Sequence, residues 1–336
     1  MKKLILISLG IEIPIFIMVL LSIALNYNPQ DFISIAPYIL PFILIFSSLT
    51  LIWFLMGKSG SFRVTYAFIK RRFQVFTSYK FQIIFTIFNI FLMVIIFYIV
   101  GKPFVEIMFA SMSGGLLNYG GYDFLTFIIV GMIAWPMLLS GYSIASRKIR
   151  QEQYTGMFEI MIPTKYGVKV LPFASLLTGT LSSITMTISS LLVIIFLLHV
   201  DLKLGNPLAL LGLISIIILS LLTMWELGLI FGGLTAIYKQ LGPVSSILQT
   251  IMMFFCGIYI PVQILPAYIK PLSYALPLTY AFRAIRASMI SGQGIMDYLW
   301  DVIVLFIFCV IMVIGGYIVF TKLLDKARKY GTVYGY

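Results

Sequence analysis

Charged residues are scarce in this chain. Of its 336 residues only 10% are charged and 61% are hydrophobic, and the mean hydropathy is +1.07. So few charges could not cover the apolar surface of a water-soluble protein of this size. We therefore expect a polytopic membrane protein.

Histidine and cysteine are also rare. The single histidine, His199, excludes the pair of histidines that an intramembrane zinc protease needs, and we interpret it as an interfacial residue. Cys256 and Cys309 both lie in apolar runs, where a thiol behaves as a small hydrophobe. Two such residues provide neither a disulfide framework nor the spacing of metal ligands.

Catalytic motifs are missing as well. No G-x-S-x-G nucleophile elbow occurs, and Gly57-Lys58-Ser59 lacks the first glycine of a phosphate-binding loop because Ile52 stands there. The aspartates that could form an intramembrane pair fall at or beyond the outer ends of the apolar runs: Asp123, Asp201, Asp297 and Asp301. We expect no enzyme and no cofactor in this chain.

Long apolar runs are abundant. A helix needs about 20 residues to cross about 30 Å of hydrocarbon. Runs of sufficient length lie near residues 4–26, 36–57, 83–101, 123–145, 173–199, 207–237, 243–262 and 299–322. The sequence thus predicts eight membrane-spanning helices.

The basic residues orient these spans. With both termini in the cytoplasm, 18 of the 23 lysines and arginines fall inside, and Lys102, Lys203, Lys270, Arg283 and Arg286 fall outside. This bias is the one that the positive-inside rule predicts. The formal charge of +12 is therefore a topology signal and does not indicate nucleic-acid binding.

The first run could instead be a signal peptide, since Lys2 and Lys3 precede it, and its loss would not change the later spans.

An amphipathic segment lies between the second and third spans. Aromatic and aliphatic residues recur there at helical spacing, and the basic side chains lie mostly off that face. The apolar positions include Phe62, Tyr66, Ile69 and Phe73, and Arg72 is among the basic ones. We expect a helix along the inner membrane surface, with a plain basic connector as the alternative.

The most polar stretch between two spans is residues 147–165. Glu152 and Glu159 are seven residues apart and so share a helix face, Gly156 lies between them, and Pro163 marks the end. A soluble partner could dock there, or the segment could be a solvated loop.

A proline-rich apolar segment, residues 257–280, follows the seventh run. Its prolines are Pro261, Pro266, Pro271 and Pro277. Proline at this density cannot continue a spanning helix. A sharp kink followed by an ordinary external loop would be one way to end the span here.

These two segments resemble landmarks of the ATP-binding-cassette type-2 permease family. The first corresponds to the family's coupling helix, with Glu152, Gly156, Glu159 and Pro163. The second matches the hallmark near the fifth core helix, with Gly257, Pro261, Leu265-Pro266 and the Pro277-Leu278-Thr279-Tyr280 motif. The resemblance covers roughly residues 61–322.

The resemblance implies an all-α fold with a six-helix type-2 exporter core. Residues 1–60 would form two extra N-terminal transmembrane helices, residues 61–82 an interfacial elbow helix, residues 83–322 the core, and residues 323–336 a cytoplasmic tail. Within the core, the coupling helix would cover about 150–162 and the external re-entrant helices about 263–290. Gly257, Pro261, Pro266, Pro277 and Tyr280 would then belong to the external cap.

The resemblance also implies partners and a function. Two copies of a separate ATPase subunit, which bind ATP and Mg, would dock on Glu152, Gln153, Gly156, Phe158 and Glu159. The permease would act as a homodimer or with a sister permease in the inner membrane of a prokaryote, and would export a hydrophobic, amphipathic or lipid-linked compound. The sequence does not name that compound. The rivals are an ion-driven transporter that uses Glu226 and a membrane anchor that only recruits an ATPase.

Three charged residues are candidates for a substrate path or gate. Glu226 lies deep in the sixth run, where a carboxylate is costly, and it could face a cavity or bond to a neighbouring helix through Thr223 or Trp225. Arg283 and Arg286 are three residues apart on one helix face. They could attract lipid phosphates or an anionic substrate, or they could pair with Asp297 or Asp301.

Overall fold

The computed structural model describes residues 118–119, 122–154, 207–238 and 241–329, together with the single helical residues 70, 74, 85, 88, 92, 95 and 99. The predicted spans at 4–26, 36–57 and 173–199 lie outside the described residues.

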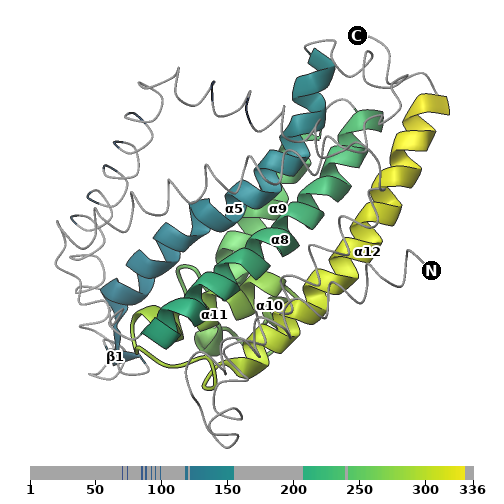
Figure 1. Cartoon of the computed structure of the whole chain (residues 1–336). Coiled ribbons are helices and arrows are strands. Elements are labelled where there is room, and N and C mark those ends of the chain that lie inside the picture. Colours follow the sequence, from purple (N-terminus) through teal and green to yellow (C-terminus); the bar gives the residue numbers. More distant parts are fainter. Residues whose placement is uncertain are drawn as a thin grey trace, which may run out of the picture.

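Three long helices form the described bundle (Figure 1). They are α5 (Phe124–Tyr154), α8 (Pro207–Ile237) and α12 (Leu299–Lys329), and each has 31 residues. Their candidate membrane spans are Thr126–Arg147, Gly212–Ile237 and Leu299–Ala327. Apart from Asp123, these helices contain the predicted runs 123–145, 207–237 and 299–322, because long uninterrupted apolar sequence leaves few places for a helix to end.

The central helix α8 packs against α5 on one side and α12 on the other. Its residues are apolar nearly all round, which is typical of a helix enclosed by others, and Trp225, Met224 and Leu219 are fully buried. By contrast, α12 exposes a stripe of isoleucines at steps of four and three: Ile307, Ile311, Ile314 and Ile318.

Glycines bring these helices close together. Gly141 of α5 lies against the carbonyl of Leu221, and Gly228 of α8 lies against the carbonyl of Tyr142. On the other face of α8, Gly316 of α12 approaches Glu226. The small size of Gly228 therefore allows α5 and α8 to pack closely within the chain.

The three helices run in the same direction. Contacts between α5 and α8 advance along both helices together, from Gly141 with Leu221 to Tyr142 with Gly228. Figure 1 shows all three starting at the end of the bundle near α11. This is the direction that strict alternation requires of the fourth, sixth and eighth predicted spans.

The seventh run forms a shorter helix than predicted. We expect a span over 243–262, but α9 (Gly242–Phe255) has 14 residues and covers about 21 Å at 1.5 Å per residue. It is too short to cross the hydrocarbon alone. Gly257 takes a positive φ of 81°, which turns the chain, and Pro261 follows.

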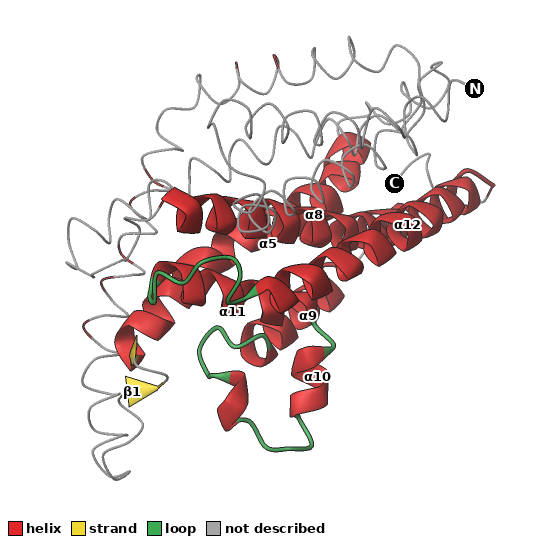
Figure 2. Cartoon of the chain, turned by 60° about the horizontal axis from the view of Figure 1, so that its bottom comes forward, coloured by secondary structure: helices red, strands yellow, loops and turns green. Residues whose placement is uncertain are grey.

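Short helices follow, and each has a proline within one residue of its start. Pro261 precedes the 3-10 turn η2 (Val262–Ile264), and Pro271 and Pro277 stand in the first turns of α10 (Lys270–Tyr274) and α11 (Pro277–Met289). Proline suits a first turn because its missing N–H would have no partner there. Figure 2 shows α10 and its connecting loops projecting from the bundle.

The Pro277-Leu278-Thr279-Tyr280 motif joins α10 to α11. Leu278 is buried, the Thr279 hydroxyl donates to the carbonyl of Ser273, and the Tyr280 hydroxyl donates to the carbonyl of Tyr274 at 3.0 Å. Helix α11 then packs against α8, α12 and α5. The motif thus fixes the short helix α10 against α11, and α11 packs inside the bundle.

The described part of the chain is not wholly helical. A two-residue antiparallel ribbon, β1 (Asn118–Tyr119) and β2 (Tyr122–Asp123), stands directly before α5. It is a small departure from the all-α expectation.

Candidate functional site

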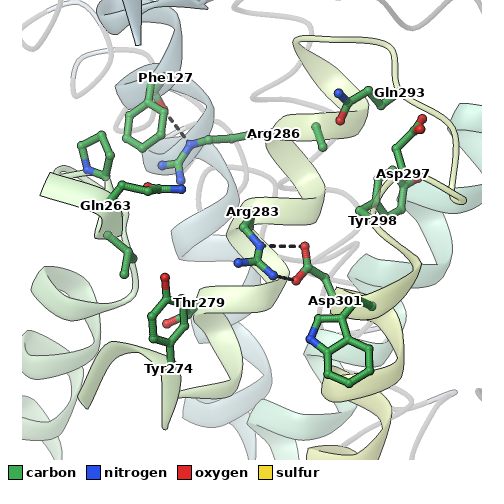
Figure 3. A pocket seen from close by; sticks show the side chains of 14 residues that line it. Phe127, Gln263, Tyr274, Thr279, Arg283, Arg286, Gln293, Asp297, Tyr298 and Asp301 are labelled. Atoms are coloured by element: carbon green, nitrogen blue, oxygen red, sulfur yellow. Dashed lines mark hydrogen bonds and ion pairs between the residues drawn. The ribbon is translucent and has the colours of Figure 1, made fainter. Parts of the chain in front are cut away.

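A cavity of about 390 Å³ opens at the end of the bundle where α5, α8 and α12 begin (Figure 3). Its wall combines charged, amide and aromatic side chains from α11, from the turn after α9 and from the start of α12. The lining includes Phe127, Gln263, Tyr274, Arg283, Arg286, Gln293, Asp297, Trp300 and Asp301.

Arg283 is paired across the cavity wall with Asp301 of α12. Its Nε lies 2.8 Å from Oδ2, and its Nη2 bonds to Oδ1, so the pair is bidentate. The hydrogen bonds that Arg283 donates to the Asp301 carboxylate raise the pKa of Arg283. Asp297 instead accepts the backbone N–H of Gly294 at 3.0 Å. Of the alternatives that the sequence left open for Arg283, the structure supports pairing with Asp301.

Arg286 has a different environment. Its side chain is 5% exposed, Nε donates to the carbonyl of Phe127 at 3.1 Å, and Nη2 donates to the carbonyl of Ile258 at 2.9 Å. The guanidinium carbon lies 3.6 Å from the centroid of the Phe127 ring, a cation–π contact. No carboxylate of the described residues pairs with it. Burial lowers the pKa of Arg286 to about 9, which leaves it charged at neutral pH.

Gly131 makes room for this arginine. A Cβ at that position would stand 2.5 Å from Nη2 of Arg286 and 2.6 Å from the carbonyl oxygen of Ile258. Sequence reasoning missed Phe127, Gly131 and Ile258, because each lies in an apolar run where nothing distinguishes it from a packing residue. Only the fold reveals that they surround a buried cation.

The other end of α5 carries two of the predicted coupling residues, Glu152 and Gln153. The helix continues beyond its candidate span, which ends at Arg147, as far as Tyr154. Gln151 and Tyr154 are exposed there, and the Arg150 guanidinium stacks on the Tyr154 ring at 4.7 Å. Gly156, Phe158 and Glu159 lie outside the described residues.

Glu152 is placed differently from the prediction. We expect it to face a docked partner, but its side chain is only 3% exposed, and Gln153 is half-buried. Helical geometry turns neighbouring positions to different sides, so the exposed positions of this end are Gln151 and Tyr154. Of the two predicted coupling residues that the structure describes, Glu152 is thus buried and Gln153 is half-buried.

Little of the elbow segment is described. Lys70 and Gln74 are helical and exposed, and their spacing of four puts them on one face. The residues that define the elbow prediction lie outside the described ranges: Phe62, Tyr66, Ile69, Arg72 and Phe73.

Glu226 faces α12 and does not line this cavity. Its side chain is 1% exposed, its Oε2 has no hydrogen-bond partner among the described residues, and Gly316 packs against it. The Thr223 hydroxyl donates within its own helix to Leu219 at 2.9 Å, and Trp225 Nε1 has no described acceptor. Neither predicted partner bonds to this carboxyl group.

Comparison with known proteins gives one family. No curated protein matches the chain. The family described as ABC-2 type transporter matches residues 63–290, which is more than half of the chain and includes α5, α8, α9 and α11. The long apolar helices agree with a multi-pass membrane protein. The chain therefore belongs to the ABC-2 type transporter family and is a membrane permease subunit of an ABC transporter.

Proposed function

We propose that this permease exports a hydrophobic, amphipathic or lipid-linked compound. Two copies of a separate ATPase subunit, which bind ATP and Mg, drive it, and it works as a homodimer or with a sister permease. It resides in the inner membrane of a prokaryote with both termini in the cytoplasm, as the distribution of basic residues favours.

The observation that carries this proposal is the reach of α5. Its first turn supplies the Phe127 carbonyl to Arg286 at the cavity, and its last turn exposes Gln151 and Tyr154. The 25 residue-to-residue steps from Phe127 to Glu152 cover about 37 Å of helix, more than the hydrocarbon thickness of about 30 Å. The length of this single helix thus supports a connection between the cavity and a polar end on the opposite side of the membrane.

Further contacts transmit movement of α5 to its neighbours. The Tyr142 hydroxyl bonds to Ser245 of α9 at 2.7 Å, and Gly141 packs against the backbone of α8. Docking of the ATPase at the polar end, followed by closure of the ATPase pair on ATP, would shift the bundle between inward-open and outward-open populations. The cavity near α11 would lie on the exit side.

Transport into inverted membrane vesicles tests the proposal. Vesicles containing the chain and its co-expressed ATPase are expected to take up a labelled amphiphile only with ATP, and deletion of residues 150–160 should abolish uptake. Tyr268→Ala, an exposed position at the opposite end, is the matched control and should transport normally. Uptake that persists after the deletion would contradict the proposal, and ATPase binding without transport of any compound would favour a membrane anchor.

A further inference from the structure

We propose that the cavity beside α11 binds a phosphate-ester group, with Arg286 as its anion contact. This extends the proposed function by naming a class of molecule that the exporter recognises at the cavity. Binding is measured without the ATPase, so the two proposals can fail separately.

The charges of the cavity wall single out Arg286. Arg283 already has its counter-ion in Asp301, whereas Arg286 contacts two backbone carbonyls and the rings of Phe127 and Phe282, and no carboxylate among the described residues. A guanidinium has five N–H donors, and those two carbonyl bonds use two of them. A buried cation attracts an anion strongly because little water screens it. The planar donor set of arginine suits the oxygens of phosphate.

The two sides of the cavity differ in charge. In Figure 3, Gln263 lies on the side of the Arg286 guanidinium, whereas Gln293 and Asp297 lie on the opposite side. One oxygen of Asp297 accepts the N–H of Gly294, and its carboxylate can accept further hydrogen bonds from a hydroxyl or amine. A headgroup with a phosphate at one end and such a donor at the other would match both sides.

Aromatic residues place the cavity at the depth of lipid headgroups. Trp300 is 69% exposed at the start of α12, and Tyr274 of α10 is also exposed, and both line the cavity. Tryptophan and tyrosine with this exposure are typical of the membrane–water interface. Further along α12, away from the cavity, Ile307 and Ile311 continue the exposed face that begins at Trp300. An acyl chain could lie along this face while its headgroup occupies the cavity.

Binding to the purified full-length chain in detergent tests this inference. The probes are a short-chain phosphatidylglycerol, free glycerol 3-phosphate and a neutral glyceride of the same chain length, titrated by calorimetry. We expect saturable binding of the phosphatidylglycerol at least tenfold tighter than of the glyceride. Glycerol 3-phosphate that competes fully would identify a free phosphate ester as the ligand, and failure to compete would identify the lipid. Equal binding of the glyceride, or no saturable binding of either phosphate, would overturn the proposal.

Substitution of Arg286 alone is ambiguous, because it also bonds to α5 and to the turn after α9. Gln263→Glu avoids this, since Gln263 is exposed and the new carboxylate would compete for the guanidinium. Gln293→Glu adds the same charge on the opposite side of the cavity and is the matched control. We expect tenfold weaker phosphatidylglycerol binding for Gln263→Glu and less than threefold for Gln293→Glu. An unchanged affinity in Gln263→Glu, or equal losses in both, would refute the assignment to Arg286.

Discussion

At the scale of single residues, position in the fold gives similar side chains different roles. Arg283 and Arg286 lie three residues apart on α11, yet the first pairs with Asp301 and the second is buried against Phe127. Their shared helix face could be predicted from spacing. The sequence could not predict which aspartate pairs with which arginine, because the pairing depends on how α11 packs against α12 and α5.

The pair of Arg283 and Asp301 should contribute modestly to stability. The Arg283 side chain is 41% exposed, so solvent screens the interaction, and we expect Asp301→Asn to lower the free energy of unfolding by about 1 kcal/mol. Thermal unfolding in detergent measures the loss, and Asp297→Asn, which keeps the ion pair, is the control. Equal thermal-unfolding midpoints for the two variants would show that the ion pair does not contribute to stability.

Glu226 should be dispensable for ATP-driven transport. It faces α12 and does not line the cavity, so Glu226→Gln, which conserves its size, should retain ATP-dependent uptake in vesicles within about twofold, well under 1 kcal/mol. The same assay, with an imposed ion gradient and no ATP, distinguishes ATP-driven transport from ion-coupled transport. Uptake that follows the gradient and disappears in Glu226→Gln would favour an ion-coupled transporter.

At the scale of helices, apolar run length predicted the existence of α5, α8 and α12, and proline positions indicated where the short helices begin. The end of α9 was predicted too late. Tyr259 and Ile260 continue the apolar run, but Gly257 with its positive φ has already turned the chain. Composition shows where a helix could continue, whereas the backbone at one glycine decides where this one ends.

The contact between α8 and α12 provides a paired test. In Gly316→Ala the new Cβ would stand 2.8 Å from Oε2 of Glu226, so we expect a loss of about 1–3 kcal/mol in unfolding free energy. In Gly315→Ala no atom of the described residues lies within 4 Å of the new Cβ, and the gain in helix propensity should stabilise the protein by up to about 1 kcal/mol. Unfolding in denaturant compares the variants, and equal effects would mean that α12 does not pack on α8 at Gly316.

At the scale of the whole molecule, the alternation of spans agrees with the common direction of α5, α8 and α12. The sequence also indicated that polar residues would follow the span of α5. It could not show that Glu152 turns inward, because the spacing of two glutamates defines a shared face without saying what that face contacts. Gln151 and Tyr154 become the positions of interest only through their exposure.

The reach of α5 predicts that the ATPase docks at the end of this helix opposite the cavity. Site-specific photo-cross-linking in membranes measures this directly, with a photoreactive residue in place of Tyr154 or of Tyr268, both exposed and at opposite ends. We predict a cross-link from position 154 to the co-expressed ATPase subunit and none from position 268. A cross-link from position 268 instead, or none at 154 while the two subunits still co-purify, would contradict the account.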